Sequence, residues 1–404
     1  MEGASGATRH GAPAAPVCSL ALDRLDRFMT EEVRQRKAEH VSVALQQDVA
    51  APQRSSWQDI CLIHQSLPEV DLEAVDTSVT FLGKTLRAPI VISSMTGGHP
   101  DVAIINERLA QAAEEFGLAM GVGSQRAGIV SPDLAETYAV VRARAPQALL
   151  IANIGAPQLI EQPRHPAFTL EDARRAVEMI DADALAVHLN FAQEAVQPEG
   201  DRRAVGCRAA LRALAGEIGL PVIAKETGAG VCREQALLLR DCGVAAIDVG
   251  GAGGSSMAAM ETYRALARGD DLSANLGQVF RDWGTPTPIA VVEGGVAGLP
   301  LIATGGVRTG LDAARALGLG ATLVGMAFPF LKAASEGYEA VQAFVQQFVL
   351  ELKVAMQLSG AANVDGLRQA DVIVGGETRQ WLELRGFGET LRAMANRRLG
   401  SNML

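Results

Sequence analysis

The sequence predicts a (β/α)8 barrel, the TIM-barrel fold, because short apolar runs alternate with helical patterns from about residue 88 onward. The runs are almost continuously apolar, which is typical of parallel strands that are buried on both faces. The predicted strands are 89–94, 118–123, 148–154, 184–190, 221–226, 245–250, 301–305 and 321–326. An open, doubly wound sheet is the alternative fold that the same alternation allows.

The segments between the apolar runs have the spacing of amphipathic helices. They predict helices at 102–116, 132–144, 170–180, 206–218, 232–241, 257–268 and 309–317. A longer helix is expected over 335–358, after the last strand. Residues 252–300 are rich in Gly and Pro and exceed an ordinary connection, so we interpret this segment as a functional insertion after the sixth strand.

The chain divides into four predicted parts. A length of 404 residues fits one barrel with insertions better than two equal domains. The parts are a disordered extension at 1–30, an N-terminal arm and cap at 31–87, the barrel with C-terminal helices at 88–390, and a tail at 391–404. The segment 22–47, which spans the boundary between the extension and the arm, looks helical or partly so. Residues 1–17 lack the apolar stretch of a signal peptide, with a transit peptide as the minor alternative.

Composition limits the classes of partner. The chain has 36 basic and 46 acidic residues, hence a net charge of −10, which argues against a nucleic-acid-binding or general membrane-surface protein. No apolar run reaches the roughly 18 residues of a membrane span. The cysteines show neither a disulfide framework nor a zinc pattern; they are Cys18, Cys61, Cys207, Cys232 and Cys242. We therefore expect a cytoplasmic protein without a nucleic-acid or membrane partner.

Polar residues follow the predicted strands at their C-terminal ends, which is where a TIM barrel carries its active site. They are Ser94, Met95 and Thr96; Ser124, Gln125 and Arg126; Asn153; His188 and Asn190; Lys225 and Glu226; Asp248; and Gly305 and Gly306. Their regular recurrence at one end of the strands predicts an enzyme.

The segment 301–328 reads as strand, glycine loop, helix and strand, with Gly305, Gly306 and Arg308 in the loop. Glycines let the backbone approach a ligand closely, and the neighbouring N–H groups can then point at phosphate oxygens. A TIM barrel places its phosphate site after strands seven and eight, which is where this loop falls. The alternative is a tight left-handed turn that binds nothing.

Two charged residues, one at the end of a strand and one in the segment after a strand, each have a functional and a structural interpretation. Lys225 ends a buried strand, where it either meets a ligand or forms an ion pair with Glu226 or Asp248. Glu194, in the segment 188–201, can bind Mg²⁺ if a diphosphate supplies further oxygen ligands. Taken alone, Glu194 reads as a solvated charge.

Basic residues occur in two places that a barrel would bring to one opening. The run 34–40 contains Arg36, Lys37 and His40, and it is either an arm that folds over the barrel or a solvated helix face. Arg126 follows the second strand, where an unpaired guanidinium would be costly and a bound anion would remove that cost. The pattern predicts a small, strongly anionic substrate.

Several catalytic signatures are missing from the sequence. No G-x-G-x-x-G motif follows the first strand, and no Cys or Ser is placed as an obvious nucleophile beside a base. The chemistry is therefore expected to belong to a cofactor.

These motifs resemble those of the type 2, flavin-dependent isopentenyl-diphosphate delta-isomerases, over roughly residues 30–390. The matching pieces are RKAEH (36–40), SSMTGG (93–98), GVGSQRAG (121–128), ANIGAPQL (152–159), HLNFAQEAVQPEGD (188–201), KETGAG (225–230), DVGGAGGSS (248–256), WGTPT (283–287) and GGVRTGLDAARALGLGA (305–321). The resemblance implies bound FMN, Mg²⁺, NADPH as reductant, and a homo-oligomer, a tetramer or octamer. It implies reversible conversion of isopentenyl diphosphate, a prenyl diphosphate, to dimethylallyl diphosphate.

The resemblance also implies roles for individual residues. Catalysis would belong to the reduced flavin, assisted by Gln193 and Lys225. The FMN contacts would be Met95, Thr96, Ser124, Asn153, Lys225, Ser255, Gly305, Gly306, Arg308, Ala327 and Phe328. The substrate contacts would be Arg36, Lys37, His40, Ser124, Gln125, Arg126, His188, Asn190 and Gln193, and Glu194 would bind the metal.

The chain departs from the family pattern at three places. Ser255 replaces a common Thr, Met257 replaces a common Trp, and GDRRAV (200–205) replaces the usual run of GDR followed by an acidic and an aromatic residue. Two alternative functions stay open. One is another FMN-dependent barrel oxidoreductase, although 2-hydroxy-acid oxidases need a late catalytic His and no His follows His188. The other is a barrel that binds FMN or phosphate without catalysis.

Overall fold

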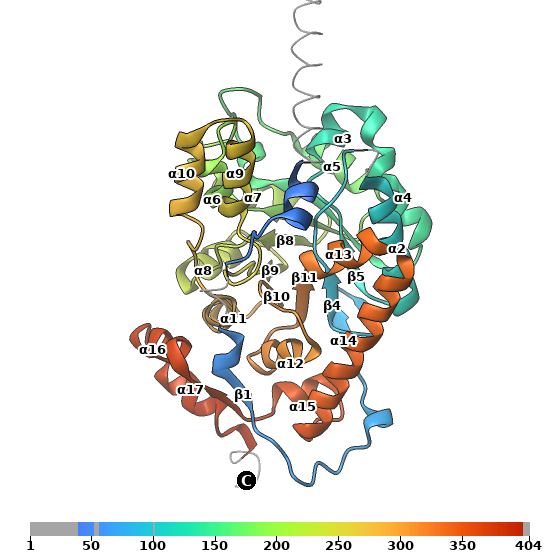
Figure 1. Cartoon of the computed structure of the whole chain (residues 1–404), viewed down its shortest axis with the longest axis vertical. Helices are drawn as coiled ribbons and strands as arrows, with labels where there is room; N and C mark the ends of the chain where they lie inside the picture. Colours follow the sequence, from blue (N-terminus) through green and yellow to red (C-terminus); the bar gives the residue numbers. More distant parts are fainter. Residues whose placement is uncertain (1–38, 52–55, 100–101, 399–404) are drawn as a thin grey trace, which may run out of the picture.

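Eight parallel strands close into a barrel in the computed structural model, which describes residues 39–51, 56–99 and 102–398 (Figure 1). The strand order around the barrel is β10-β11-β4-β5-β6-β7-β8-β9. The strands are β4 (Ile90–Ile92), β5 (Ala119–Gly121), β6 (Leu149–Gly155), β7 (Ala184–His188), β8 (Val222–Lys225), β9 (Ala246–Asp248), β10 (Leu301–Thr304) and β11 (Leu323–Met326). The predicted barrel is confirmed, and the open sheet is wrong because β4 pairs with both β5 and β11.

The predicted helices lie on the outside of the barrel (Figure 1). They are α2 (Ala103–Phe116), α4 (Glu136–Arg144), α5 (Leu170–Met179), α7 (Cys207–Glu217), α8 (Arg233–Asp241), α9 (Met257–Ala267) and α12 (Gly310–Gly318). Two short helices that the pattern did not predict are α3 (Arg126–Val130), in the connection after β5, and α6 (Phe191–Val196), in the connection after β7.

The insertion after the sixth barrel strand carries extra helices. Helix α10 (Asp271–Val279) lies beside α9, and α11 (Thr287–Gly294) then leads to β10 (Figure 1). The long helix expected over 335–358 is confirmed as α14 (Tyr338–Leu358), and a further helix, α13 (Phe328–Glu336), precedes it. They are separated by Gly337, whose φ of +151° is not helical.

The C-terminal part of the described chain packs on the barrel's N-terminal segment. Strand β12 (Val372–Val374) pairs antiparallel with β1 (Ile60–Leu62). The remaining helices are α15 (Val364–Arg368), α16 (Gly376–Leu384) and α17 (Gly388–Met394). Helix α17 continues past residue 390, so the predicted boundary of the tail falls inside a helix. No described helix has both the length and the apolarity to cross a membrane.

Alternate residues of each barrel strand face inward and form one buried cluster. Val91, Ile151, Ala186 and Ile302 belong to it. A hairpin of β2 (Val79–Phe81) and β3 (Lys84–Leu86) adds Phe81 and Leu86 to the same cluster. The hairpin therefore covers one end of the barrel interior.

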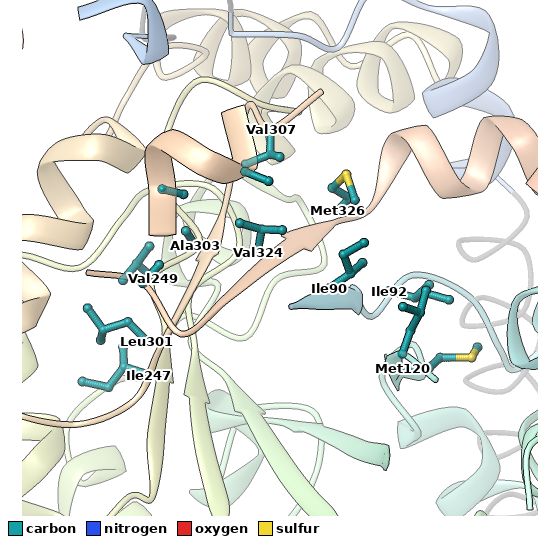
Figure 2. Close-up of a cluster of buried hydrophobic side chains, with 14 of the residues drawn as sticks. Ile90, Ile92, Met120, Ile247, Val249, Leu301, Ala303, Val307, Val324 and Met326 are labelled. Atoms are coloured by element: carbon teal, nitrogen blue, oxygen red, sulfur yellow. The ribbon is translucent and has the colours of Figure 1, made fainter. Parts of the chain in front are cut away.

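The intervening strand residues face the surrounding helices. Figure 2 shows this second cluster, in which Ile90, Ile92, Leu301 and Ala303 lie on the outer side of their strands. Because successive side chains of a strand point to opposite faces, the inward set continues toward the C-terminal ends as polar residues. Those residues are Ser93, Asn153, His188, Lys225, Asp248 and Thr304. The strand period thus places a polar layer directly above the apolar barrel core.

Candidate active site

A cavity of about 270 Å³ lies at the C-terminal ends of the barrel strands. It is lined by most of the residues that sequence analysis predicted, and their contacts with ligands stay predictions. Those residues are His40, Met95, Thr96, Ser124, Arg126, Asn153, His188, Asn190, Gln193, Glu194, Lys225, Ser255, Gly305, Gly306, Arg308, Ala327 and Phe328. Arg36 and Lys37 lie outside the described residues.

The prediction that Gln125 contacts the substrate does not fit the structure. Its side chain is fully buried and is absent from the cavity lining. The amide donates to the carbonyl oxygen of Ala176 at 2.7 Å and accepts from the backbone N–H of Asn153 at 2.8 Å. Both polar atoms of the amide are therefore hydrogen-bonded within the barrel wall, where Gln125 binds the backbone of Asn153.

Asn153 and His188 form an ordered pair in the polar layer. The Asn153 amide donates to the Val122 carbonyl at 3.0 Å, so its oxygen is directed at His188 Nδ1, 2.9 Å away. An amide oxygen only accepts, and Nδ1 of His188 therefore carries a hydrogen. His188 is 9% exposed and satisfied at Nδ1, yet it also lines the cavity.

Lys225 forms an ion pair and also lines the cavity. Its Nζ lies 2.7 Å from Oδ2 of Asp248, and both side chains are buried. Glu226 is not the partner, because its Oε2 accepts the backbone N–H groups of residues 227–229 at 2.6–2.8 Å. Burial raises the pKa of Glu226 above its ordinary value, against the effect of those hydrogen bonds. Of the two structural alternatives for Lys225, the Asp248 pair is the correct one.

Glu194 is a buried carboxylate at the cavity wall and not a solvated charge. It is 6% exposed. Its Oε2 accepts from the backbone N–H of Asp201 at 2.7 Å, and its Oε1 accepts from Asn190 at 3.1 Å. Within the described ranges, no three His, Cys, Asp or Glu side chains cluster as a metal site. A cation at Glu194 would therefore need oxygens from a ligand.

Arg126 is paired, which corrects the expectation of an uncompensated guanidinium. Its Nη1 lies 2.8 Å from Oδ2 of Asp201, a buried carboxylate that also accepts from Gln158 and His165. Burial opposes ionisation of Asp201, but His165, Arg126 and Gln158 outweigh it and lower the pKa to about 2. Arg126 still lines the cavity, so the pair holds a cation in place at its wall.

Sequence reasoning missed a second ionic cluster, centred on Glu261 and Arg264 of α9. Glu261 is 1% exposed and accepts from His40 at 2.9 Å and from Gln193 at 2.7 Å. Arg264 pairs with Glu261, with Glu199 and with Glu39 of the arm. The cluster joins the arm helix, 39–46, to α9.

Electrostatics within this cluster favour the charged forms. Burial opposes ionisation of Glu261, but His40, Arg264 and Gln193 outweigh it and lower the pKa to about 2. Burial likewise opposes the charge of Arg264, yet Glu261 and Glu199 raise its pKa. The spacing of three between Glu261 and Arg264 places them on one helix face. Nothing in the sequence, however, shows that this face meets Gln193.

The glycine loop after β10 is packed tightly against neighbouring backbone. Gly305 has φ of +124°, and a Cβ there would lie 2.2 Å from the carbonyl oxygen of Gly251. Gly306 has φ of +72°, and its Cβ would lie 2.7 Å from the oxygen of Gly253. Trp57, which the sequence did not single out, donates from Nε1 to the Gly305 oxygen at 3.1 Å. The loop is thus fixed in a conformation that only glycine adopts easily.

This loop and the start of α13 make a cradle that fits a phosphate group. Ala327 and Phe328, at the start of α13, line the same cavity as Gly305 and Gly306. Free backbone N–H groups and the helix dipole favour an anion at such a position.

Three buried polar atoms of the cavity lining also suit a polar ligand. Ser93 Oγ, Thr304 Oγ1 and Asn190 Oδ1 have no hydrogen-bond partner among the described residues. Buried polar groups are rarely left unsatisfied, so each is a candidate to bind a ligand or water. The residues present therefore fit a phosphate-bearing cofactor with a polar ring system, as FMN is.

Comparison with known proteins decides the family. A family model described as FMN-dependent dehydrogenase matches residues 139–374. The isopentenyl-diphosphate delta-isomerase of Methanosarcina barkeri is 47% identical over 360 residues, which cover 89% of this chain and 97% of the relative. This chain belongs to the type 2, FMN-dependent isopentenyl-diphosphate delta-isomerase family.

Other members of the isomerase family match equally well. The proteins of Methanothermobacter thermautotrophicus and Archaeoglobus fulgidus are each 47% identical, over 88% and 87% of this chain and 97% and 99% of the relatives. Membership makes this protein an enzyme of the isomerase class and a flavoprotein.

Solved structures share the fold at low identity. A lactate oxidase of Pediococcus acidilactici superimposes with a TM-score of 0.58 at 17% identity, over 87% of this chain and 94% of that one. A mandelate oxidase variant with an FMN adduct gives 0.53 at 20%, over 81% and 91%. At this identity the likeness concerns the barrel alone.

Proposed function

We propose that this enzyme interconverts isopentenyl diphosphate and dimethylallyl diphosphate, with reduced FMN in the barrel mouth and Mg²⁺ on the diphosphate. One observation carries the proposal. The cavity lining contains the glycine loop of Gly305 and Gly306 and also a cation, Arg126, and a buried carboxylate, Glu194. Two such features suit a phosphorylated cofactor and a diphosphate substrate bound together.

The first feature would hold the cofactor. The N–H groups around Gly305, Gly306 and the start of α13 would bind its phosphate, with Arg308 nearby. Met95, Thr96, Ser124, Asn153, Lys225 and Ser255 would surround its ring. Lys225, placed in the inward polar layer, supplies a positive charge that favours an anionic reduced ring.

The second feature would hold the substrate. Arg126 would pair with the diphosphate, and His40, His188 and Asn190 would supply further donors from the same lining. Mg²⁺ commonly binds one or two carboxylates together with phosphate oxygens, which suits the lone Glu194. Arg36 and Lys37 are proposed to complete this site from the arm.

The reaction requires one proton added at the terminal carbon and one removed from carbon 2, without net redox change. When bound, reduced FMN supplies an acid–base group and an electron-rich surface beside the alkene. Gln193 donates to Glu261 at 2.7 Å, which fixes its amide beside the cavity. We propose that Gln193 assists by orienting the bound molecules and that Lys225 assists by its positive charge at the site. Clamping the diphosphate holds the reacting carbons in place.

Three further features are proposed from the resemblance. NADPH would reduce the bound FMN, the protein would act in the cytoplasm, and it would assemble as a tetramer or octamer. The described cysteines are all free thiols, which agrees with a reducing compartment.

A hydroxy-acid oxidase is not favoured by the site. Such enzymes need a histidine after a late strand, and the last histidine of this chain is His188 on β7. Anaerobic turnover separates the two functions. FMN-loaded protein reduced with NADPH should convert isopentenyl diphosphate when Mg²⁺ is present, and oxidised protein should not. Oxidation of a 2-hydroxy acid by the oxidised protein in air, with no isomerisation by the reduced protein, would overturn the proposal.

A further inference from the structure

Asp201 lies directly behind the wall of the cavity. It occupies the loop between α6 and α7, is 3% exposed, and does not itself line the cavity. A carboxylate so fully buried requires compensating contacts.

Those contacts connect two parts of the proposed diphosphate site. Oδ2 of Asp201 accepts from Nη1 of Arg126 at 2.8 Å, and its backbone N–H donates to Oε2 of Glu194 at 2.7 Å. The same carboxylate accepts from Gln158 at 2.9 Å and from His165 at 2.8 Å. One residue thus contacts a cation and a carboxylate that both line the cavity.

We propose that Asp201 is a positioning residue that holds Arg126 and Glu194 at a fixed separation, so that a diphosphate and its cation are bound as one unit. This inference rests on the proposed function. An arginine side chain that is not held in place loses rotamer entropy when a ligand immobilises it. Because Asp201 fixes Arg126 before the ligand arrives, less of that entropy is lost on binding.

The negative charge of Asp201 indicates that this residue positions its neighbours and does not itself attract an anionic ligand. The Asp201 carboxylate is negative and lies beside a site proposed for an anion, so it weakens the long-range attraction that Arg126 exerts. Its hydrogen bonds instead determine where the guanidinium and the Glu194 carboxylate point. His165 donates to the opposite oxygen, Oδ1, and thereby holds the carboxylate in the required orientation.

The test is calorimetric titration of FMN-loaded protein with inorganic pyrophosphate, with and without Mg²⁺. Asp201→Ala should weaken Mg²⁺-dependent pyrophosphate binding at least tenfold, and Asp201→Asn should lose less, because Asn keeps one acceptor oxygen. Affinity for FMN should stay within twofold. With isopentenyl diphosphate, KM should rise while kcat changes less than threefold.

Asp183 provides a matched control. It also pairs with an arginine, Arg142, at 3.0 Å and accepts a backbone N–H, that of Leu150, at 2.9 Å. It precedes β7, at the opposite end of the barrel from the cavity. Asp183→Asn should leave pyrophosphate binding unchanged.

Unchanged pyrophosphate affinity in Asp201→Ala would overturn the inference, as would an equal loss in Asp183→Asn. Wild-type protein that binds no pyrophosphate in the presence of Mg²⁺ would instead contradict the proposed function. The two failures are therefore distinguishable in one titration series.

Discussion

Lys225 and Asp248 occupy paired positions on neighbouring strands, and their charged groups meet 2.7 Å apart above the apolar barrel core. Both side chains are less than a tenth exposed. Asp248 also accepts the backbone N–H of Gly250 at 3.2 Å. The pair fixes where the lysine charge lies at the cavity, and it makes each partner costly to remove alone.

Asp248→Asn should destabilise the protein by about 3–5 kcal/mol, because it leaves Lys225 beside a neutral group in a buried site. The amide has the size of the carboxylate and keeps the acceptor for Gly250. Urea denaturation of the FMN-free protein measures the change in the free energy of unfolding.

A double-mutant cycle with Lys225→Met is the control for this effect. Removing both charges should cost less than the sum of the single changes by at least about 1 kcal/mol. Strictly additive costs would show that the 2.7 Å contact contributes little to stability.

Glu194→Gln should raise the Mg²⁺ concentration for half-maximal activity by roughly tenfold or more, since the proposed metal site loses an anionic ligand. The substitution suits the site because Asn190 Oδ1 has no hydrogen-bond partner among the described residues and can accept from the new amide after a side-chain flip. FMN affinity should not change. Normal Mg²⁺ dependence in this variant would remove Glu194 from the metal site.

Gly305→Ala should weaken FMN binding by roughly tenfold or more, because the new Cβ would lie 2.2 Å from the Gly251 carbonyl oxygen and the cradle would have to move. Gly320→Ala is the matched control, since Gly320 has φ of +111° and nothing within 4 Å of its Cβ position.

The control variant should lose about 1–3 kcal/mol of stability through backbone strain and still bind FMN normally. Fluorescence titration with FMN compares the two variants. Similar FMN affinities in both would show that the loop does not hold the cofactor phosphate.

The lowered pKa of Glu261 predicts that this residue contributes to stability in a pH-dependent way. Its pKa is lowered from 4.5 to about 2 in the folded protein. A carboxylate with a lowered folded pKa stabilises above its unfolded pKa, and that stability is lost as the pH falls toward the folded value. The contribution is on the order of 3 kcal/mol near pH 7.

Urea denaturation of the wild type and of Glu261→Gln tests this contribution. The wild type should be more stable at pH 7, and the difference should shrink between about pH 4.5 and pH 2. A difference that stays constant over this range would contradict the assignment of a lowered pKa to Glu261.

The barrel could be predicted from sequence because its strands are buried on both faces and read as continuous apolar runs. The sequence placed Asn153, His188 and Lys225 at the C-terminal ends of strands, and in the structure the period of two puts them in the inward layer. Gln125 was misjudged because it follows a strand in a turn, where the period no longer fixes direction. Its amide points into the wall and toward Ala176.

Pairings between distant segments could not be predicted. Arg126 and Asp201 are 75 residues apart, and Glu261 meets Gln193 across 68 residues. The sequence places each of these residues on an element, but the packing of the insertion helix α9 against α6 brings the second pair together. The amino-acid composition and the spacing of apolar residues carry no information about how these two helices pack.

The most direct test of the proposed isomerisation is a proton NMR time course of isopentenyl diphosphate in D₂O, with FMN-loaded, reduced protein and Mg²⁺ under anaerobic conditions. The account predicts formation of dimethylallyl diphosphate with deuterium in a methyl group and exchange at carbon 2, and no reaction with oxidised protein. An unchanged spectrum from protein that is fully loaded and reduced, or product without solvent deuterium, would contradict it.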